Sequence, residues 1–124
     1  MNFSIKEVSE RLGIPPHTIR YYEKEGLLPN IQRDPNGNRM FEQKDVDWID
    51  IMMRLRATGM SVVTVRKMVD LTVKGDVTIP ERKAILEKHK LELQRKQVEL
   101  DRANEVVNKK LLIYESMMSV HIRE

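Results

Sequence analysis

The chain has 124 residues, of which 33% are charged and only 5% aromatic, and its formal net charge is +3. This length predicts one domain with an extension, and the mildly basic charge does not by itself establish a nucleic-acid partner. The absence of cysteine excludes disulfides, thiolate metal sites and thiol redox sensing. His17, His89 and His121 stand far apart, no apolar run is long enough for a membrane span, and no secretory signal begins the chain. We therefore expect a cytoplasmic protein without a metal site or cofactor.

Residues 4–26 carry the signals of two short helices joined by a tight turn. Ser4 and Glu7 stand at capping-box spacing and predict the start of the first helix, and Gly13 predicts its end. Pro16 suits the first turn of a second helix, which begins only three residues later. Two short helices around a glycine-containing turn are typical of a helix-turn-helix.

Residues 30–41 predict a small β-hairpin. The run Asp34-Pro35-Asn36-Gly37 fits a type I turn position by position, and short flanking segments on both sides can pair. A hairpin this short is not stable alone. It must lean on the helices, as the wing of a winged helix-turn-helix does.

Residues 43–74 predict two further helices. The first runs from Gln43 to Thr58, with apolar side chains at helical spacing, and the second begins at Ser61 and ends before Gly75. We therefore expect a winged helix-turn-helix domain over residues 1–75.

Residues 78–118 predict one long helix, because this stretch contains no glycine and only one proline, Pro80, near its start. Thr78 and Glu81 repeat the capping-box spacing. Forty helical residues would extend roughly 60 Å, a length that no single small domain can bury.

Apolar residues of this long helix recur every seven positions and predict a coiled coil, strongest toward the C-terminal end. The alternative is a solvated single helix packed on its own domain, but one flank of that domain cannot hide five heptads. We therefore expect a homodimer, although the spacing does not settle parallel or antiparallel pairing. The predicted dimerisation residues are Leu86, Leu93, Leu100, Val107, Leu111, Tyr114 and Met118.

A helix-turn-helix places its second helix in the major groove of DNA. Arg20 could there bond a guanine or clamp a phosphate, and the hydroxyls of Tyr21 and Tyr22 could reach phosphate oxygens. His17 and Thr18 begin the helix, where base edges or the DNA backbone come closest. In the alternative interpretation Arg20 is a surface charge and both tyrosines belong to the core, which is most plausible for Tyr22.

Four segments, T-I-R-Y-Y-E, G-L-L-P, N-G-N-R and L-R-A-T-G-M-S, follow one another at characteristic spacing. In this order they closely resemble the MerR family of transcriptional regulators, and the similarity covers essentially all of residues 2–73. The resemblance implies a mainly α fold: a winged helix-turn-helix DNA-binding domain plus a long C-terminal coiled-coil dimerisation helix that pairs antiparallel. It also implies a pseudo-palindromic promoter operator, which the dimer bends and untwists so that RNA polymerase can engage the promoter.

The resemblance assigns DNA contacts to one set of positions: His17, Thr18, Arg20, Tyr21, Tyr22, the wing residue Arg39, and Arg56 before the turn between the third and fourth helices. Arg56 could instead be a plain solvated charge. Residues 51–75, however, carry five basic side chains against one acidic, which favours a phosphate contact.

The chain departs from the family pattern at the starts of two helices and in the features that relatives use for sensing. Pro15 replaces the usual hydroxyl residue before the second helix, and Glu42 stands where Ser or Thr often begins the third. No cysteine is present for metal or redox sensing, and we expect no further effector domain after the long helix. The sequence is most similar to a small branch linked to aldehyde or electrophile stress, but it leaves the signal, including any small-molecule inducer, open.

Two other functions compete with a promoter-specific regulator. An architectural nucleoid or recombination accessory protein could use the same fold to bend DNA at many sites. A protein-interaction module could have lost DNA binding, although Arg20, Arg39 and Arg56 together argue against this. An enzyme is least expected, because the sequence shows no metal-ligand cluster, nucleophile–base pair or phosphate-binding glycine loop.

Overall fold

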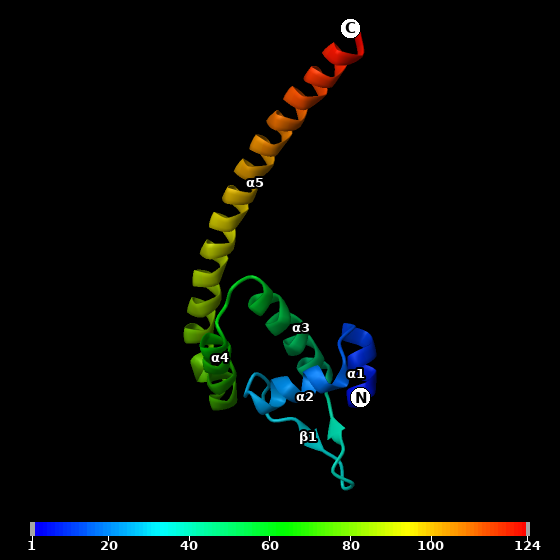
Figure 1. Cartoon of the computed structure of the whole chain (residues 1–124). Helices are drawn as coiled ribbons and strands as arrows, with labels where there is room; N and C mark the ends of the chain where they lie inside the picture. Colours follow the sequence, from blue (N-terminus) through cyan, green and yellow to red (C-terminus); the bar gives the residue numbers. More distant parts are fainter. Residues whose placement is uncertain (1, 124) are drawn as a thin grey trace. The chain divides into compact units, whose positions relative to one another are not determined.

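The computed structural model describes residues 2–123 of the chain and the side chains of residues 2–120, so the side chain of His121 lies outside the described part. The chain divides into two compact units, residues 1–86 and 87–124. The predicted mainly α fold with a helix-turn-helix, a wing and a long last helix is confirmed (Figure 1). In chain order the elements are α1 (Ile5–Leu12), α2 (Pro16–Lys24), β1 (Gln32–Arg33), β2 (Arg39–Met40), α3 (Gln43–Ala57), α4 (Val62–Lys74), the 3-10 helix η1 (Asp76–Thr78) and α5 (Ile79–Arg123).

The capping box at the start of α1 forms as predicted. The Ser4 hydroxyl accepts a hydrogen bond from the Glu7 backbone N–H, and the Glu7 carboxylate accepts one from the Ser4 N–H, each at 3.1 Å. Gly13 ends the helix in the left-handed region, at φ 68°. These local bonds define both ends of α1.

The start of α2 has no side-chain cap, because Pro15 occupies the N-cap position and offers no hydroxyl. Pro16 lies in the first helical turn, as expected. Beyond the end of α2, Leu27 and Leu28 are buried, and the Trp48 indole on α3 donates to the Leu27 carbonyl at 2.8 Å. The helix-turn-helix is thereby held against α3.

The predicted hairpin forms between β1 and β2, which pair antiparallel with Gln32 opposite Met40 and Arg33 opposite Arg39. Its turn is closed by the Gly37 N–H donating to the Asp34 carbonyl at 2.9 Å. The wing is joined to the start of the chain by two backbone hydrogen bonds between Phe3 and Phe41, at 2.7 and 2.8 Å.

The helices α3 and α4 supply much of the core. Val46, Ile49 and Met52 of α3 are buried, as are Val65 and Met68 of α4. Their caps differ: the Ser61 hydroxyl accepts from the Thr64 N–H at 3.1 Å, whereas at α3 the buried Asp45 carboxylate accepts from the Glu42 N–H at 2.8 Å. Asp45 therefore plays at α3 the part that Glu7 plays at α1, and its bond satisfies the N-cap N–H of Glu42.

The connection into α5 differs from the expected capping box. Thr78 is the last residue of η1 and is buried, and α5 begins at Ile79. The Thr78 hydroxyl lies 2.6 Å from the Leu71 carbonyl oxygen and 2.8 Å from that of Gly75, so it satisfies the end of α4. Ile85 packs against the core, which is why the first turns of α5 belong to the first compact unit.

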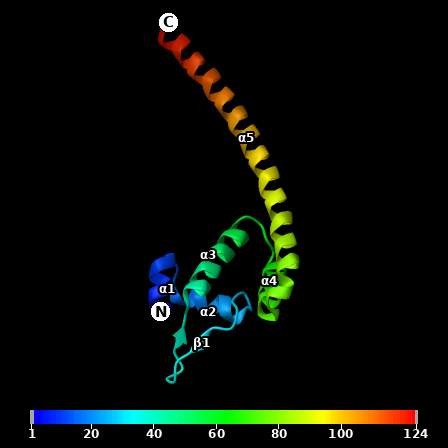
Figure 2. The same ribbon diagram turned by 180° about the vertical axis from the view of Figure 1, so that it is seen from behind.

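The helix α5 continues as a single α-helix to Arg123 (Figure 2). In the described part of the chain no helix is both long and apolar enough to cross a membrane. The seven predicted dimerisation residues, from Leu86 to Met118, are all exposed on this helix in the single chain.

Candidate nucleic-acid interface

One face of α2 is exposed along its whole length. His17, Arg20, Tyr21 and Lys24 recur at intervals of three and four residues and are all exposed, while Ile19 on the other side is fully buried. The face thus presents a guanidinium, a phenol, an imidazole and an ammonium group together. Lys24 was not predicted as a site residue, although its position one helical turn after Arg20 and Tyr21 indicates that it lies on the same face.

The two tyrosines of α2 have different surroundings. Tyr21 is 56% exposed, whereas Tyr22 is half-buried and packs against the hydrophobic core. Their ring centroids are 6.2 Å apart. Thr18, beside them, is also half-buried. The core interpretation therefore holds in part for Tyr22, and a DNA contact by Tyr22 rests on the part of the ring that is not buried.

A cleft of about 460 Å³ lies between the start of α1, α2 and the wing. Arg20 of α2, Arg39 of β2 and Lys6 of α1 all line it, together with Asn2 and Asn38. The structure thus brings the predicted residues Arg20 and Arg39 to one cavity although they are distant in sequence. Lys6 was not predicted from the sequence, because only the fold brings it to the same cleft as Arg20 and Arg39.

The wing arginines are held by a carboxylate of α2. Glu23 Oε1 accepts from Arg39 Nε at 2.9 Å and lies 3.3 Å from Arg33 Nη2. Neither Glu23 nor Arg33 was expected to belong to the site. Asp34 also lines the cleft, but its carboxylate accepts hydrogen bonds from the Asn36 and Asn38 N–H groups. Cations therefore dominate the chemistry of this face.

Arg56 does not line this cleft. It is exposed in the last turn of α3, and its Nη1 donates to the Met60 carbonyl at 2.7 Å, across the turn between α3 and α4. Its neighbour Arg54 lies near Asp50 on the same helix, with a separation of 3.4 Å. Arg56 thus braces a turn, and a phosphate contact remains a prediction for it.

Comparison with known proteins identifies the family to which this chain belongs. The family described as "MerR HTH family regulatory protein" matches residues 3–72, and the family described as "MerR, DNA binding" matches residues 46–108. The chain belongs to the MerR family. Members of this family are DNA-binding transcriptional regulators, and the exposed face of α2 lies within the first matched segment.

Several relatives resemble this MerR protein over most of its length. A regulator of Haemophilus influenzae, named "Uncharacterized HTH-type transcriptional regulator", is 36% identical over 115 residues, which cover 93% of this chain and 85% of the relative. AdhR of Bacillus subtilis is 34% identical over 67% of this chain and 59% of its own. The solved structure of HiNmlR, "a MerR family regulator lacking the sensor domain, bound to promoter DNA", has a TM-score of 0.85 and 36% identity, covering 94% of this chain and 92% of HiNmlR.

Proposed function

We propose that this MerR protein acts as a homodimer on a pseudo-palindromic promoter operator. Two copies pair through α5, and each presents the exposed face of α2 to the major groove of one half-site. The dimer bends and untwists the operator so that RNA polymerase can use the promoter. The observation that carries the proposal is the likeness to HiNmlR over nearly the whole chain, since that protein was crystallised on promoter DNA.

Pairing through α5 follows from its exposed apolar residues. Leu100 and Val107 are 60% and 55% exposed, and Leu111, Tyr114 and Met118 continue the same helix face. A soluble chain gains free energy by covering such a stripe with a second helix of the same pattern. A copy of α5 itself offers that pattern.

Contact with DNA follows from the charges around α2. With α2 in the major groove, Arg20 can donate two hydrogen bonds to a guanine, and the cleft lined by Lys6, Arg20 and Arg39 can take a backbone phosphate. His17, Thr18, Tyr21, Tyr22 and Arg56 would add contacts to the backbone or to base edges. Such contacts must offset the cost of bending a site of this size, which is on the order of several kcal/mol.

The experiment is selection of genomic DNA fragments with the purified protein, followed by footprinting. Protection of one site between promoter elements is expected. Spread protection over many sites would instead indicate an architectural protein. The regulated genes beside the recovered fragments would also indicate the signal.

The variant Arg20→Ala tests whether Arg20 contacts a base, and its binding is measured on a DNA fragment recovered in the selection. Binding should weaken by roughly 1–3 kcal/mol, with relaxed preference at one base pair, if Arg20 contacts a base. Arg102→Ala on α5 is the matched control, because it removes the same charge outside the winged unit. Equal affinities of wild type, Arg20→Ala and Arg102→Ala would remove Arg20 from the interface.

A further inference from the structure

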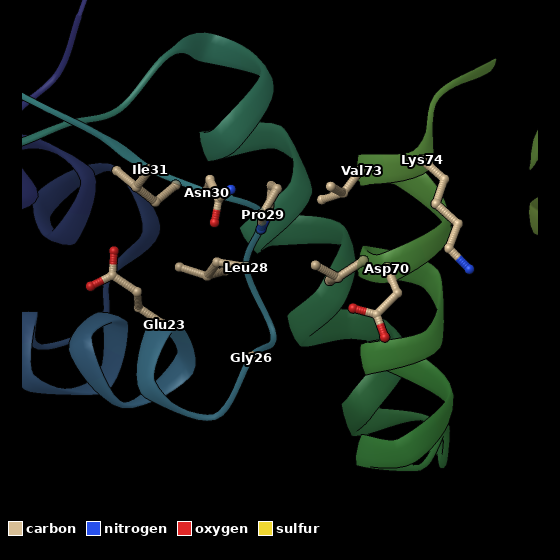
Figure 3. A pocket seen from close by; sticks show the side chains of 10 residues that line it. Glu23, Gly26, Leu28, Pro29, Asn30, Ile31, Asp70, Val73 and Lys74 are labelled. Atoms are coloured by element: carbon tan, nitrogen blue, oxygen red, sulfur yellow. The ribbon is translucent and has the colours of Figure 1, made fainter.

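Glu23 is the residue of α2 whose carboxylate reaches the wing. Its Oε1 atom accepts from Arg39 Nε at 2.9 Å and pairs with Arg33 Nη2 at 3.3 Å. Figure 3 shows the Glu23 side chain rising from α2 toward the segment that carries Ile31, just before β1. One carboxylate oxygen therefore connects α2 to both strands of the hairpin.

The two arginines that Glu23 joins would otherwise repel each other. Arg33 and Arg39 are directly opposite in the antiparallel pair, and like charges at such positions are destabilising. The hairpin has only two paired residues in each strand, so it has little stability of its own. A negative charge between the arginines turns this repulsion into attraction and ties the hairpin to α2.

The pair of Glu23 with Arg39 is sheltered from solvent, since the two side chains are only 25% and 20% exposed. Exposed ion pairs are weakened by water and salt, and partly buried pairs much less so. Arg33, with a side chain 48% exposed, is the weaker partner. Glu23 should therefore act mainly through Arg39.

The hydrogen bond at Nε fixes the plane of the Arg39 guanidinium. Arginine has five N–H donors in a rigid fork, so bonding of Nε leaves the two Nη groups to face another acceptor. Arg39 lines the cation-rich cleft together with Arg20 and Lys6, whereas Glu23 does not line it. Glu23 lines a different hollow of about 650 Å³, between the segment after α2 and α4 (Figure 3). The Glu23 carboxylate thus bonds Arg39 without lining the cleft itself.

We propose that Glu23 is a positioning residue for DNA binding, which aims the guanidinium of Arg39 at a DNA phosphate in the cleft. This inference rests on the proposed function, because it takes the cleft as a place where DNA is held. In this proposal the acidic residue Glu23 strengthens the binding of DNA, although DNA is itself negatively charged. Charge alone predicts the opposite, since removing a carboxylate near the interface should strengthen DNA binding.

The test compares Glu23→Ala with Glu25→Ala on a DNA fragment selected with the wild-type protein. Glu25 is a matched control: it lies two residues further along, it forms its ion pair with Arg66 of α4 at 2.9 Å, and its loss changes the net charge equally. Glu23→Ala should weaken binding about tenfold, since a hydrogen bond to a charged group contributes about that factor. The slope of log affinity against log salt should fall by about one, as for the loss of one phosphate contact. Glu25→Ala should leave the slope unchanged.

Two further variants separate positioning from general stability. Glu23→Gln keeps an acceptor oxygen and should recover part of the lost affinity. In an Arg39→Ala background, Glu23→Ala should cause little additional loss, because the residue it positions is already gone. Thermal unfolding of each variant confirms that the protein tested is folded.

The possible outcomes distinguish the inference from the proposed function. Tighter binding by Glu23→Ala, or equal losses in Glu23→Ala and Glu25→Ala, would overturn the positioning role of Glu23. Unchanged affinity in Arg39→Ala would show that the wing makes no useful contact with DNA, which overturns the positioning role and the proposed use of the cleft. Failure of the wild-type protein to select any fragment would instead overturn the proposed function itself.

Discussion

Replacing Leu100 and Val107 by lysine should separate the proposed dimer into monomers. Full burial of a leucine or valine side chain contributes about 1.5–3 kcal/mol. Leu100 and Val107 are 60% and 55% exposed in the single chain. Burial of this exposed part of each side chain in the dimer therefore contributes about 1.3 kcal/mol. The dimer contains four such side chains, and their sum is about 5 kcal/mol. The dissociation constant should therefore rise by nearly four powers of ten, before any repulsion between the lysines.

The chain offers a closely matched control on the opposite face of the same helix. Leu91 and Val98 are also a leucine and a valine seven residues apart, and their exposures are 67% and 48%. Helical periodicity places them about half a turn away from Leu100 and Val107. Changing them to lysine should alter the free energy of dimer dissociation by no more than about 0.5 kcal/mol, the usual range for surface substitutions.

Sedimentation equilibrium over a range of protein concentrations measures both variants against the wild type. Dissociation of the Leu100 and Val107 variant, with an intact dimer in the control, is the expected result. Dissociation of the control alone would place the interface on the other face of α5. Stable dimers in both variants would place it outside this helix, and monomeric wild-type protein would refute the dimer.

Two further changes test the cleft and the fold. Lys6→Ala should reduce the slope of log affinity against log salt for operator binding by about one, because Lys6 lines the cation-rich cleft. Binding titrations at several salt concentrations measure this slope. An unchanged slope would show that Lys6 contacts no phosphate. Ser4→Ala should lower the free energy of unfolding by about 1 kcal/mol, since the Ser4 hydroxyl caps the Glu7 N–H. Urea denaturation followed by circular dichroism measures this free energy. No loss of stability would mean that water replaces the cap at no cost.

The helix boundaries could be predicted because their signals are local. The bonds of Ser4 to Glu7 and of Ser61 to Thr64 span three residues, so spacing alone reveals them. Thr78 has the same spacing to Glu81, but its hydroxyl bonds carbonyls at the end of α4. Sequence spacing shows which bond a hydroxyl can make, and the neighbouring element decides which bond it does make.

The parts of the site that were missed depend on contacts between distant residues. Glu23 and Arg39 are separated by sixteen positions, and Arg66 and Glu25 by forty-one. From the sequence, Glu23 on the short helix α2 is expected to be a solvated charge. Only the pairing of the wing strands places Arg33 and Arg39 beside it. Asp45 is a similar case, because its burial follows from the packing of α3 and is not apparent from the sequence.

The contacts at the end of α2 connect this helix to the wing, to α4 and, through α4, to the first turns of α5. Glu23 ties α2 to the wing, while Arg66 of α4 donates to the Glu25 carbonyl at 2.6 Å and pairs with its carboxylate. At the other end of α4, Arg82 in the first turns of α5 donates to the Gly75 carbonyl at 3.1 Å. The second copy in the proposed dimer would carry the same chain of contacts. Half-sites on DNA must lie a whole number of helical turns apart for two such helices to enter the groove on the same side. Arg66 bonds the Glu25 backbone carbonyl, which Glu25→Ala keeps, so Arg66 and Arg82, and not the Glu25 carboxylate, would help to set the operator spacing in the proposed dimer.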